Sequence, residues 1–339
     1  MNPAFAPYIE AVETEMRAVV CSSAADLSGL YGMMLYHLGW LDAQLRPEKA
    51  DAGKRLRPLL CLLTCEAAGG QWQRAVPAAA ALELVHNFSL LHDDIEDQSA
   101  TRRGRAAVWK VWGLAHGINS GDAMLMLARL ALARLHDRGY APAAILKATT
   151  LLDRTCLELT HGQYLDISGE GDLTMTEERY LRMIGGKTAA LAAASTEMGA
   201  FLAGNSAAAP HYHDFGRNLG LAFQMVDDLL GIWGDPAVTG KPAGDDLLSR
   251  KMTLPVIHAV ASTESGQDLL ALYRLPTWSA EILAEALRLL EQCGSRDYVQ
   301  SRALDYHRRA ATALENARPS EPAAALLTEF ASALVSRLK

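Results

Sequence analysis

Apolar side chains recur every three or four residues over most of the chain, which is the spacing of one face of an α-helix. The pattern holds from Arg17 to the end of the sequence, with clear examples in LLCLLTC, AMLMLARLALARL and AEILAEALRLL. The alternation of β-branched and polar residues that marks a half-buried strand is nearly absent. The sequence therefore predicts an all-α fold.

Short segments, most of them rich in Gly, Pro, Asp or Asn, interrupt the helical pattern. They lie at 46–47, 68–70, 137–142, 168–173, 204–210, 233–244 and 275–276. We expect roughly ten helices between them, with boundaries good to about two to four residues. No repeat of solenoid period and no low-complexity linker divides the chain. We therefore predict one domain over residues 1–339, a bundle of antiparallel helices around a central cavity.

The composition limits which ligands such a fold is expected to bind. Of the 339 residues, 50% are hydrophobic and 21% are charged, which is enough apolar material for a large core. The net charge of −7 argues against a general nucleic-acid surface, because such surfaces are usually strongly basic. An anionic ligand would therefore need a local cationic pocket.

The N-terminal segment and the cysteines bear on where the protein is found. Glu10, Glu13 and Glu15 stand where an export signal would need a basic start and an apolar run. No apolar stretch approaches the roughly 18 residues that a membrane-spanning helix requires. The five cysteines form neither a CxxC pair nor a dense framework, and Cys61 and Cys65 fit a helix core better than a metal site. We expect a soluble, cytoplasmic protein without a membrane span.

Acidic residues are densest in the segment ELVHNFSLLHDDIEDQ, residues 83–98. Asp93 and Asp97 are four residues apart, so on a helix both carboxylates project from one face, with Asp94 flanking them. Magnesium is usually held by one or two protein carboxylates together with substrate phosphates, and this spacing suits such a site. The alternative interpretation is a solvated acidic helix end.

Basic residues follow this cluster at once and favour the metal-diphosphate interpretation. Arg102, Arg103 and Arg105 lie in a glycine-containing turn, and arginine forks match phosphate oxygens. His86 precedes Asp93 by seven residues, two helical turns away on the same face. A lone histidine is more often a satisfied core residue, and that interpretation stays open.

A second group of cations stands in AGKRLRPLLCLL, where Lys54, Arg55 and Arg57 precede an apolar helix. Pro58 is well placed as an early helical residue. An anion could dock at such a helix start. A basic turn on the surface is the alternative.

Two further segments carry candidate ligand contacts in the second half of the chain. Gly185 and Gly186 interrupt a helix beside Lys187 and Thr188, where exposed carbonyls and a cation could face a ligand; a loose glycine pair in a packed helix is the alternative. In LAFQMVDDLLGIWGDPAVTGK, Gln224 and Asp228 share a helix face, Asp227 flanks them, and Lys241 follows in a loop. The alternative is an amphipathic helix that ends in a polar loop.

Taken in order, these motifs resemble those of the trans-polyprenyl diphosphate synthases, the family of farnesyl and geranylgeranyl diphosphate synthases. The resemblance spans about residues 50 to 260. It rests on five ordered motifs: GKRLRP at 53–58, DDIED at 93–97 followed by RRGR, GQYLD at 162–166, GGKT at 185–188 and FQMVDDLLG at 223–231.

The resemblance implies that the helices carrying the two aspartate motifs face each other across a deep, closed-bottomed cavity with the diphosphate at its mouth. It implies magnesium as cofactor: two ions at Asp93 and Asp97 and a third at Asp227, with Asp94 and Asp228 as flanking candidates. Arg102, Lys187, Gln224 and Lys241 would hold the allylic diphosphate. Its expected chain is dimethylallyl, geranyl or farnesyl. Isopentenyl diphosphate would be held by Lys54, Arg57, His86 and Arg103. Thr188, Gln163 and Phe88 are further expected substrate contacts, and a homodimer is implied by the same resemblance.

The sequence departs from the family pattern at Gly231, where many members carry the last aspartate of the second motif. Position 231 is one helical turn from Asp227, so we expect Gly231→Asp to tighten the dependence on magnesium. Ala52 and Ala106 depart from the pattern in minor ways.

Product length is expected to depend on the residues that precede Asp93 on the same helix. Ser89 and Phe88, four and five positions earlier, lie roughly 6–7.5 Å deeper at about 1.5 Å per residue. An ideal helix turns Phe88 toward the flank, yet in related synthases an aromatic residue at this position limits chain growth. We expect a twenty-carbon product, with fifteen or twenty-five carbons, and a mere packing role for Phe88, as alternatives.

Two other functions compete with the synthase. A terpene cyclase would use the same ionisation, but it has no use for an isopentenyl site of the kind that Lys54, Arg57, His86 and Arg103 suggest. A non-catalytic subunit of a heteromeric synthase would be expected to lose the first aspartate motif, which is intact in this chain.

Overall fold

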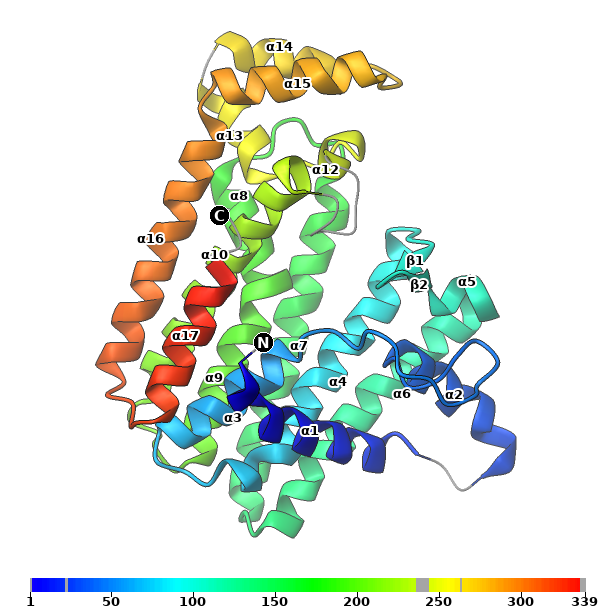
Figure 1. Ribbon diagram of the computed structural model, residues 1–339, viewed down its shortest axis with the longest axis vertical. Helices are drawn as coiled ribbons and strands as arrows, with labels where there is room; N and C mark the ends of the chain where they lie inside the picture. The colour runs from blue at the N-terminus through cyan, green and yellow to red at the C-terminus, as the bar shows by residue number, and fades with distance from the viewer. Residues whose placement is uncertain (1, 22–23, 236–243, 263, 336–339) are drawn as a thin grey trace. The chain divides into compact units, whose positions relative to one another are not determined.

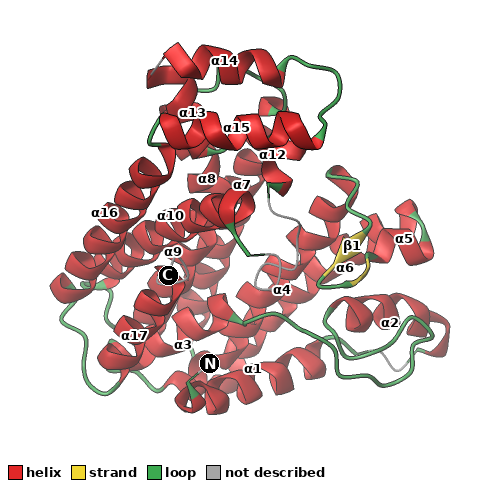
Figure 2. Ribbon diagram, turned by 45° about the horizontal axis from the view of Figure 1, so that its top comes forward, coloured by secondary structure: helices red, strands yellow, loops and turns green. Residues whose placement is uncertain are grey.

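The computed structural model of the chain describes residues 2–21, 24–235, 244–262 and 264–335. Helices make up most of these residues, and the strands among them are two pieces of two residues each (Figure 1, Figure 2). The predicted all-α class is confirmed. Within the same residues, no helix combines the length and the apolar character needed to cross a lipid bilayer.

The elements follow one another with breaks close to the predicted ones. In the first half they are η1 (Pro3–Phe5), α1 (Ala6–Val19), η2 (Ala25–Leu27), α2 (Ser28–His37), α3 (Leu56–Ala67), α4 (Trp72–Glu96), β1 (Thr101–Arg102), β2 (Arg105–Ala106), α5 (Val108–Trp112), α6 (Leu114–Ala133), η3 (Arg134–Arg138) and α7 (Pro142–Gly169). In the second half they are α8 (Glu177–Ile184), the π-helical turn η4 (Gly185–Ala189), α9 (Ala190–Leu202), α10 (Ala209–Trp233), α12 (Asp245–Leu248), α13 (Leu254–Ser262), α14 (Glu264–Tyr273), α15 (Ala280–Gln292), α16 (Ser295–Asn316) and α17 (Ala323–Val335).

The chain divides into two compact units. The first comprises Met1–Cys156, Ala194–Tyr212 and Ala317–Ala324, and the second comprises Leu157–Ala193, His213–Asn316 and Ala325–Lys339. The expected single domain stays a prediction. The helices are also more numerous than the roughly ten expected, because short elements such as α5 and α12 carry too few residues to show a period in the sequence.

In the first unit, small residues let α4 approach α6 closely. A Cβ atom added at Gly121 of α6 would lie 2.2 Å from Nε2 of His92, and one added at Gly117 would lie 2.8 Å from Cδ1 of Ile95. Deeper in α4 the run of alanines at 78–81 is fully buried. This packing fixes the C-terminal end of α4, where the first aspartate cluster lies.

The glycine-containing turn predicted after this cluster is a two-residue hairpin between β1 and β2, which pair antiparallel. Both turn residues, Arg103 and Gly104, have positive φ, 52° and 72°. That backbone matches the twist of a tight hairpin and is easier for glycine than for arginine. The hairpin folds back so that Arg102 lies beside Asp93 and Asp94 at the end of α4, whereas Arg105 binds the carbonyl groups of Tyr36 and Leu41.

In the second unit, the predicted interruption at Gly185 and Gly186 is confirmed as the π-helical turn η4. A Cβ atom added at Gly162 of α7 would lie 2.0 Å from the backbone nitrogen of Lys187, and one added at Gly186 would lie 2.6 Å from the carbonyl oxygen of Glu158. The backbones of α7 and η4 therefore touch. This contact sets the position of Lys187.

We predict that Gly162→Ala destabilises the protein, because its Cβ meets backbone rather than a movable side chain. Overpacking of this kind usually costs about 1–3 kcal/mol of unfolding free energy. Thermal and denaturant unfolding measure the loss. Gly29→Ala is the matched control, because a Cβ at this position of α2 meets nothing within 4 Å. Equal stability of the two variants would contradict the backbone contact.

Candidate active site

The three carboxylates of the first cluster, at the end of α4, differ in how deeply they are buried. Asp94 is buried with 1% exposure, and it accepts a 2.8 Å hydrogen bond from Nε of Arg102. Asp93 and Asp97 are partly exposed, and Nη2 of Arg102 lies 3.3 Å from Oδ2 of Asp93. Burial raises the pKa of Asp94, while the bond and the charge of Arg102 lower it. Asp94 therefore anchors Arg102, whereas Asp93 and Asp97 lie where a ligand could reach them.

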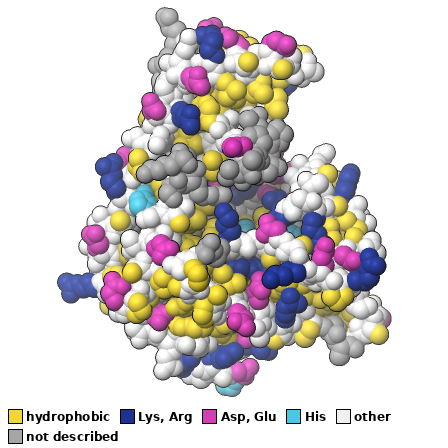
Figure 3. Space-filling view, in the orientation of Figure 1, with side chains coloured by type: hydrophobic (Ala, Val, Ile, Leu, Met, Phe, Trp, Pro, Cys, Tyr) yellow, Lys and Arg dark blue, Asp and Glu magenta, His cyan; other side chains and the backbone are white. Residues whose placement is uncertain are grey.

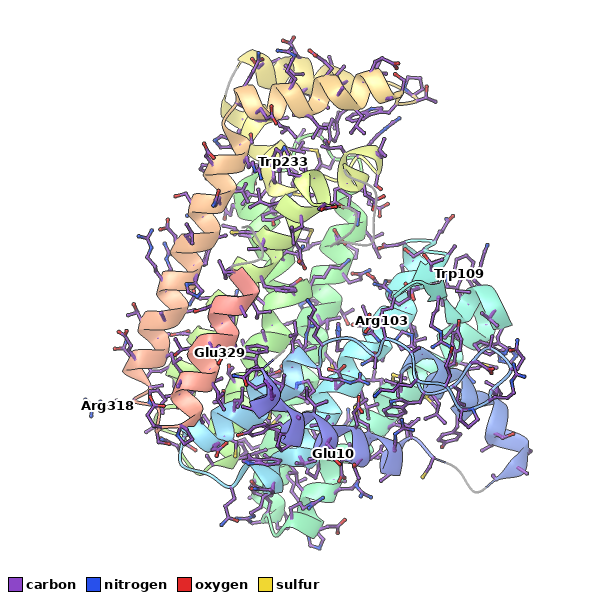
Figure 4. All side chains as sticks on the ribbon, in the orientation of Figure 1. Glu10, Arg103, Trp109, Trp233, Arg318 and Glu329 are labelled. Atoms are coloured by element: carbon purple, nitrogen blue, oxygen red, sulfur yellow. The ribbon has the colours of Figure 1, made fainter. Side chains whose placement is uncertain are left out.

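The cations predicted for a second anion lie together in the first unit. Burial lowers the pKa of His86 well below 6.5, and the charges of Arg57 and Arg103 lower it further, so this imidazole is neutral near pH 7. Arg103, labelled in Figure 4, has a buried Nη1 that makes no hydrogen bond. A Cβ atom at Gly53 would lie 2.9 Å from its Nη2, so the guanidinium lies against the turn that carries Lys54. A cluster of cations with an unsatisfied buried N–H suits an anion.

Arg55 has a different role from the basic residues on either side of it. It is buried with 2% exposure, adopts a left-handed conformation with φ of 51°, and forms a 2.8 Å ion pair with Glu83. Asn87 donates to Glu83 as well. This pair fixes the turn before α3 and so places Lys54 and Arg57. Sequence reasoning missed Glu83, although a single acid inside the apolar stretch AAALELV was a usable signal.

In the second unit, hydrogen bonds connect the predicted residues of η4 and α10. Lys187 forms an ion pair with Asp166, the last residue of the GQYLD motif. Thr188 donates a 2.8 Å hydrogen bond to Oε1 of Gln224. Asp166 was quoted in a motif but given no role, because nothing in the sequence tells which cation a carboxylate on α7 will meet.

The second aspartate cluster is divided in the same way as the first. Asp227 is partly exposed, whereas Asp228 is buried with 4% exposure. Both oxygens of Asp228 accept hydrogen bonds, from Nε2 of Gln224 at 3.1 Å and from the hydroxyl of Tyr180 at 2.7 Å. Burial raises the pKa of Asp228 to about 7, and its hydrogen bonds lower it. This geometry favours Asp227 over Asp228 as a metal ligand.

Gly231 lies against a carboxylate that the sequence did not single out. A Cβ atom at position 231 would lie 1.9 Å from Oδ2 of Asp246, which belongs to α12. The charge of Asp246 also contributes to the raised pKa of Asp228. A carboxylate from another helix therefore occupies the space beside the position where many family members carry their last aspartate.

The remaining predicted residues are less informative. Lys241 lies outside the described residues. Gln163 is partly exposed on α7, next to Gly162. Phe88 is buried, and its ring meets that of His92 edge to face with centroids 5.6 Å apart.

The donor set fits magnesium that is shared with a phosphate. Within the described ranges, no three His, Cys, Asp or Glu residues form a group that could hold a metal ion. Magnesium usually keeps waters and takes only one or two carboxylates when substrate phosphates supply the rest. The partly exposed Asp93, Asp97 and Asp227 offer ligands of that kind.

Comparison with known proteins relates the chain to one enzyme family. Residues 40–290 match the polyprenyl synthetase family model. The chain is 44% identical to a geranylgeranyl diphosphate synthase of Mycobacterium tuberculosis over 82% of its length and 79% of the relative's. It is also 44% identical to a (2E,6E)-farnesyl diphosphate synthase of Mycobacterium bovis, over 79% of this chain and 75% of that one.

Solved structures are similar over almost the whole chain. A polyprenyl synthetase from Streptomyces coelicolor has a TM-score of 0.88 at 38% identity and covers 96% of this chain and 97% of its own. A geranylgeranyl pyrophosphate synthase from Corynebacterium glutamicum, complexed with isoprenyl diphosphate and magnesium, has a TM-score of 0.83 at 27% identity, with 97% and 98% covered.

The contact between Gly231 and Asp246 reverses the expectation for Gly231→Asp. A new carboxylate at 231 must displace that of Asp246 and then lies beside it with the same charge. We predict that Gly231→Asp raises the magnesium concentration for half-maximal activity by about two- to tenfold, which corresponds to a loss of about 0.4–1.4 kcal/mol of binding free energy. A magnesium titration of activity measures the change, and Gly231→Ala, which displaces Asp246 without adding a charge, separates the two effects. A tighter titration would restore the original expectation.

Proposed function

The chain belongs to the polyprenyl synthetase family, and we propose that it joins isopentenyl diphosphate to an allylic diphosphate to make a twenty-carbon prenyl diphosphate. It is a trans-prenyltransferase that makes a short-chain prenyl diphosphate. The observation that carries the finer proposal is the end of α4, where Asp93 and Asp97 are partly exposed beside an arginine held by Asp94. Carboxylates for metal and a cation for phosphate are thus placed together.

The allylic diphosphate is the ligand that we assign to the two aspartate motifs. Asp93 and Asp97 would hold two magnesium ions and Asp227 a third, with Asp246 supplying a carboxylate near the position of Gly231. Bound magnesium neutralises the diphosphate leaving group as the allylic C–O bond breaks. Arg102, Lys187, Gln224 and Lys241 would bind the same diphosphate, and the first two would exchange part of their bonding to Asp94 and Asp166 for phosphate oxygens.

Isopentenyl diphosphate is assigned to the cation cluster of the first unit. Lys54, Arg57 and Arg103 would pair with its phosphates, and the unsatisfied Nη1 of Arg103 offers one donor. His86 is neutral, so it can contribute one N–H without adding charge. A terpene cyclase has no use for such a cluster, which supports the synthase.

The reaction needs no protein nucleophile. Breaking the allylic C–O bond leaves an allylic cation and a pyrophosphate, and the isopentenyl double bond attacks that cation to form the new C–C bond. A proton then leaves the adduct, and pyrophosphate is its proposed acceptor. The protein's tasks are to orient the two diphosphates, to stabilise the leaving charge and to exclude water, which would otherwise capture the cation.

We also propose a homodimer. Leu114, Ile118, Met126 and Leu130 of α6 are exposed by 55%, 42%, 51% and 61%. They recur along the exposed stripe of this helix, Leu114 and Ile118 one turn apart and Met126 and Leu130 one turn apart. Large apolar side chains in such a row are typical of a protein interface, and a second copy of the chain is the proposed occupant.

The location proposed is the cytoplasm. All five cysteines are free thiols, as expected in a reducing compartment. On the face shown in Figure 3, Lys and Arg side chains are mixed with Asp and Glu, which agrees with the expectation that the partners are small diphosphates rather than nucleic acid.

Incubation with isopentenyl diphosphate, magnesium and each of three primers tests the proposed reaction. The primers are dimethylallyl, geranyl and farnesyl diphosphate, and chromatography of the dephosphorylated products gives their chain length. Twenty-carbon product is expected. Fifteen- or twenty-five-carbon product would correct the length and keep the reaction, whereas cyclised hydrocarbon would favour the cyclase.

We predict that Asp93→Ala lowers kcat/KM by at least about 100-fold, because one carboxylate less leaves the departing diphosphate under-neutralised. Chelation of magnesium should abolish wild-type activity, and added magnesium should restore it. Asp153→Ala is the matched control, because Asp153 is also a partly exposed aspartate paired with an arginine, Arg129, in the same unit. Near wild-type turnover by Asp93→Ala would remove this cluster from the metal site.

We predict that Phe88→Ala lengthens the product if the ring forms the floor of the cavity. The contact with His92 instead places Phe88 on the face of α4 that packs toward α6, so inter-helix packing is the competing role. Product length and melting temperature separate the two. Phe5→Ala, a buried phenylalanine of the same unit, controls for the loss of a buried ring. Unchanged product length in a less stable Phe88→Ala enzyme would leave only the packing role.

A further inference from the structure

Three elements of the second unit meet at the carboxylate of Asp228, and a fourth is linked to it through Gln224. The hydroxyl of Tyr180 on α8 donates to Oδ2 at 2.7 Å, and the backbone N–H of Leu254, at the start of α13, donates to the same oxygen at 3.1 Å. Nε2 of Gln224, one turn earlier on α10, donates to Oδ1 at 3.1 Å. Oε1 of Gln224 then accepts the 2.8 Å hydrogen bond from Thr188 in η4.

This chain of hydrogen bonds has one direction. The carboxylate of Asp228 accepts all three of its hydrogen bonds, so the amide group of Gln224 turns its NH2 end to Asp228 and its carbonyl end to Thr188. Thr188 donates its single hydroxyl proton to Gln224, so it can only accept a hydrogen bond from a ligand. Gln224 can donate its second N–H.

The fixed direction matters because both ends of a side-chain amide have the same shape. Without a group that only accepts, Gln224 could turn over and reverse the donor and acceptor that reach the ligand. Asp228 and Tyr180 are too deeply buried to meet the ligand themselves, with 4% and 1% exposure.

We propose that Asp228 and Tyr180 are positioning residues that fix the orientation of Gln224 and Thr188 toward the allylic substrate. The inference rests on the proposed function, in which those two side chains contact that substrate. It gives Asp228 a task other than metal binding. It also gives Tyr180, which no motif contains, a part in the reaction.

Asp228→Asn tests the direction of the hydrogen bonds from Thr188 through Gln224 to Asp228. The backbone N–H of Leu254 keeps the carbonyl end of the new amide on its side, so the NH2 end faces Gln224, which turns over to avoid a donor facing a donor. We expect kcat to fall about 10- to 100-fold, as for misplacement of a group near the reacting atoms. The magnesium concentration for half-maximal activity and the KM for isopentenyl diphosphate should stay within about twofold of wild type, because neither ligand is assigned to Asp228.

Tyr180→Phe removes one donor and keeps the ring, so we expect a smaller fall in kcat of about 3- to 10-fold, as for the loss of one ordinary hydrogen bond. Tyr298→Phe is the matched control. Tyr298 also donates its hydroxyl to a carboxylate, that of Glu177, at 2.5 Å, and lies in the same unit. Its loss should change the melting temperature but not kcat.

A nuclear magnetic resonance readout makes the test independent of turnover. In protein labelled with 15N-glutamine, the side-chain amide signal of Gln224, assigned by its absence in Gln224→Glu, should shift in Asp228→Asn and not in Tyr298→Phe. If this signal is the same in wild type and Asp228→Asn, the positioning role is wrong. The proposed function fails separately, if the wild-type protein makes no prenyl diphosphate.

The kinetics give two further outcomes that would overturn the inference. A large rise in the magnesium requirement of Asp228→Asn would make Asp228 a metal ligand. A lower melting temperature of Tyr180→Phe with wild-type kcat would make the network structural only.

Discussion

The ion pair between Arg102 and Asp94 shows the constraint on which the site depends: a chain with a net charge of −7 must hold cations ready for diphosphate. An arginine that is not paired would be costly to keep partly buried. A paired carboxylate holds the guanidinium in position, and phosphate oxygens can later compete for the same N–H groups. In the second unit, Asp166 forms an ion pair of the same kind with Lys187. In each unit the cation is therefore held in place before any ligand arrives.

In both aspartate clusters, two adjacent carboxylates point in different directions. Adjacent residues on a helix point about 100° apart, so Asp93 and Asp94 cannot serve the same face, and neither can Asp227 and Asp228. In each pair the second carboxylate is buried and hydrogen-bonded, whereas the first is partly exposed. The buried member holds a side chain that we assign to the diphosphate, Arg102 in one case and Gln224 in the other. The exposed member is the one that we assign to metal.

The sequence predicted the helices and the interruption at η4, because helical period and motif spacing are local properties. It did not separate Asp94 and Asp228 from their neighbours, since periodicity tells the direction of a side chain but not how deep the helix is buried. Tyr180 escaped notice for another reason. It lies 48 positions from its partner Asp228, on the amphipathic helix α8, where one buried tyrosine is unremarkable without the fold.

The contact of Gly231 with Asp246 shows why a motif read residue by residue can mislead. The missing aspartate at 231 suggested a weakened metal site, but a carboxylate from α12 lies 1.9 Å from where a side chain at 231 would begin. What the chemistry needs is negative charge at a point in space, and any helix that reaches the point can supply it. Glycine at 231 is then what allows Asp246 to approach, because any Cβ would push that carboxylate away. The departure from the motif and the nearby acid are two parts of one arrangement.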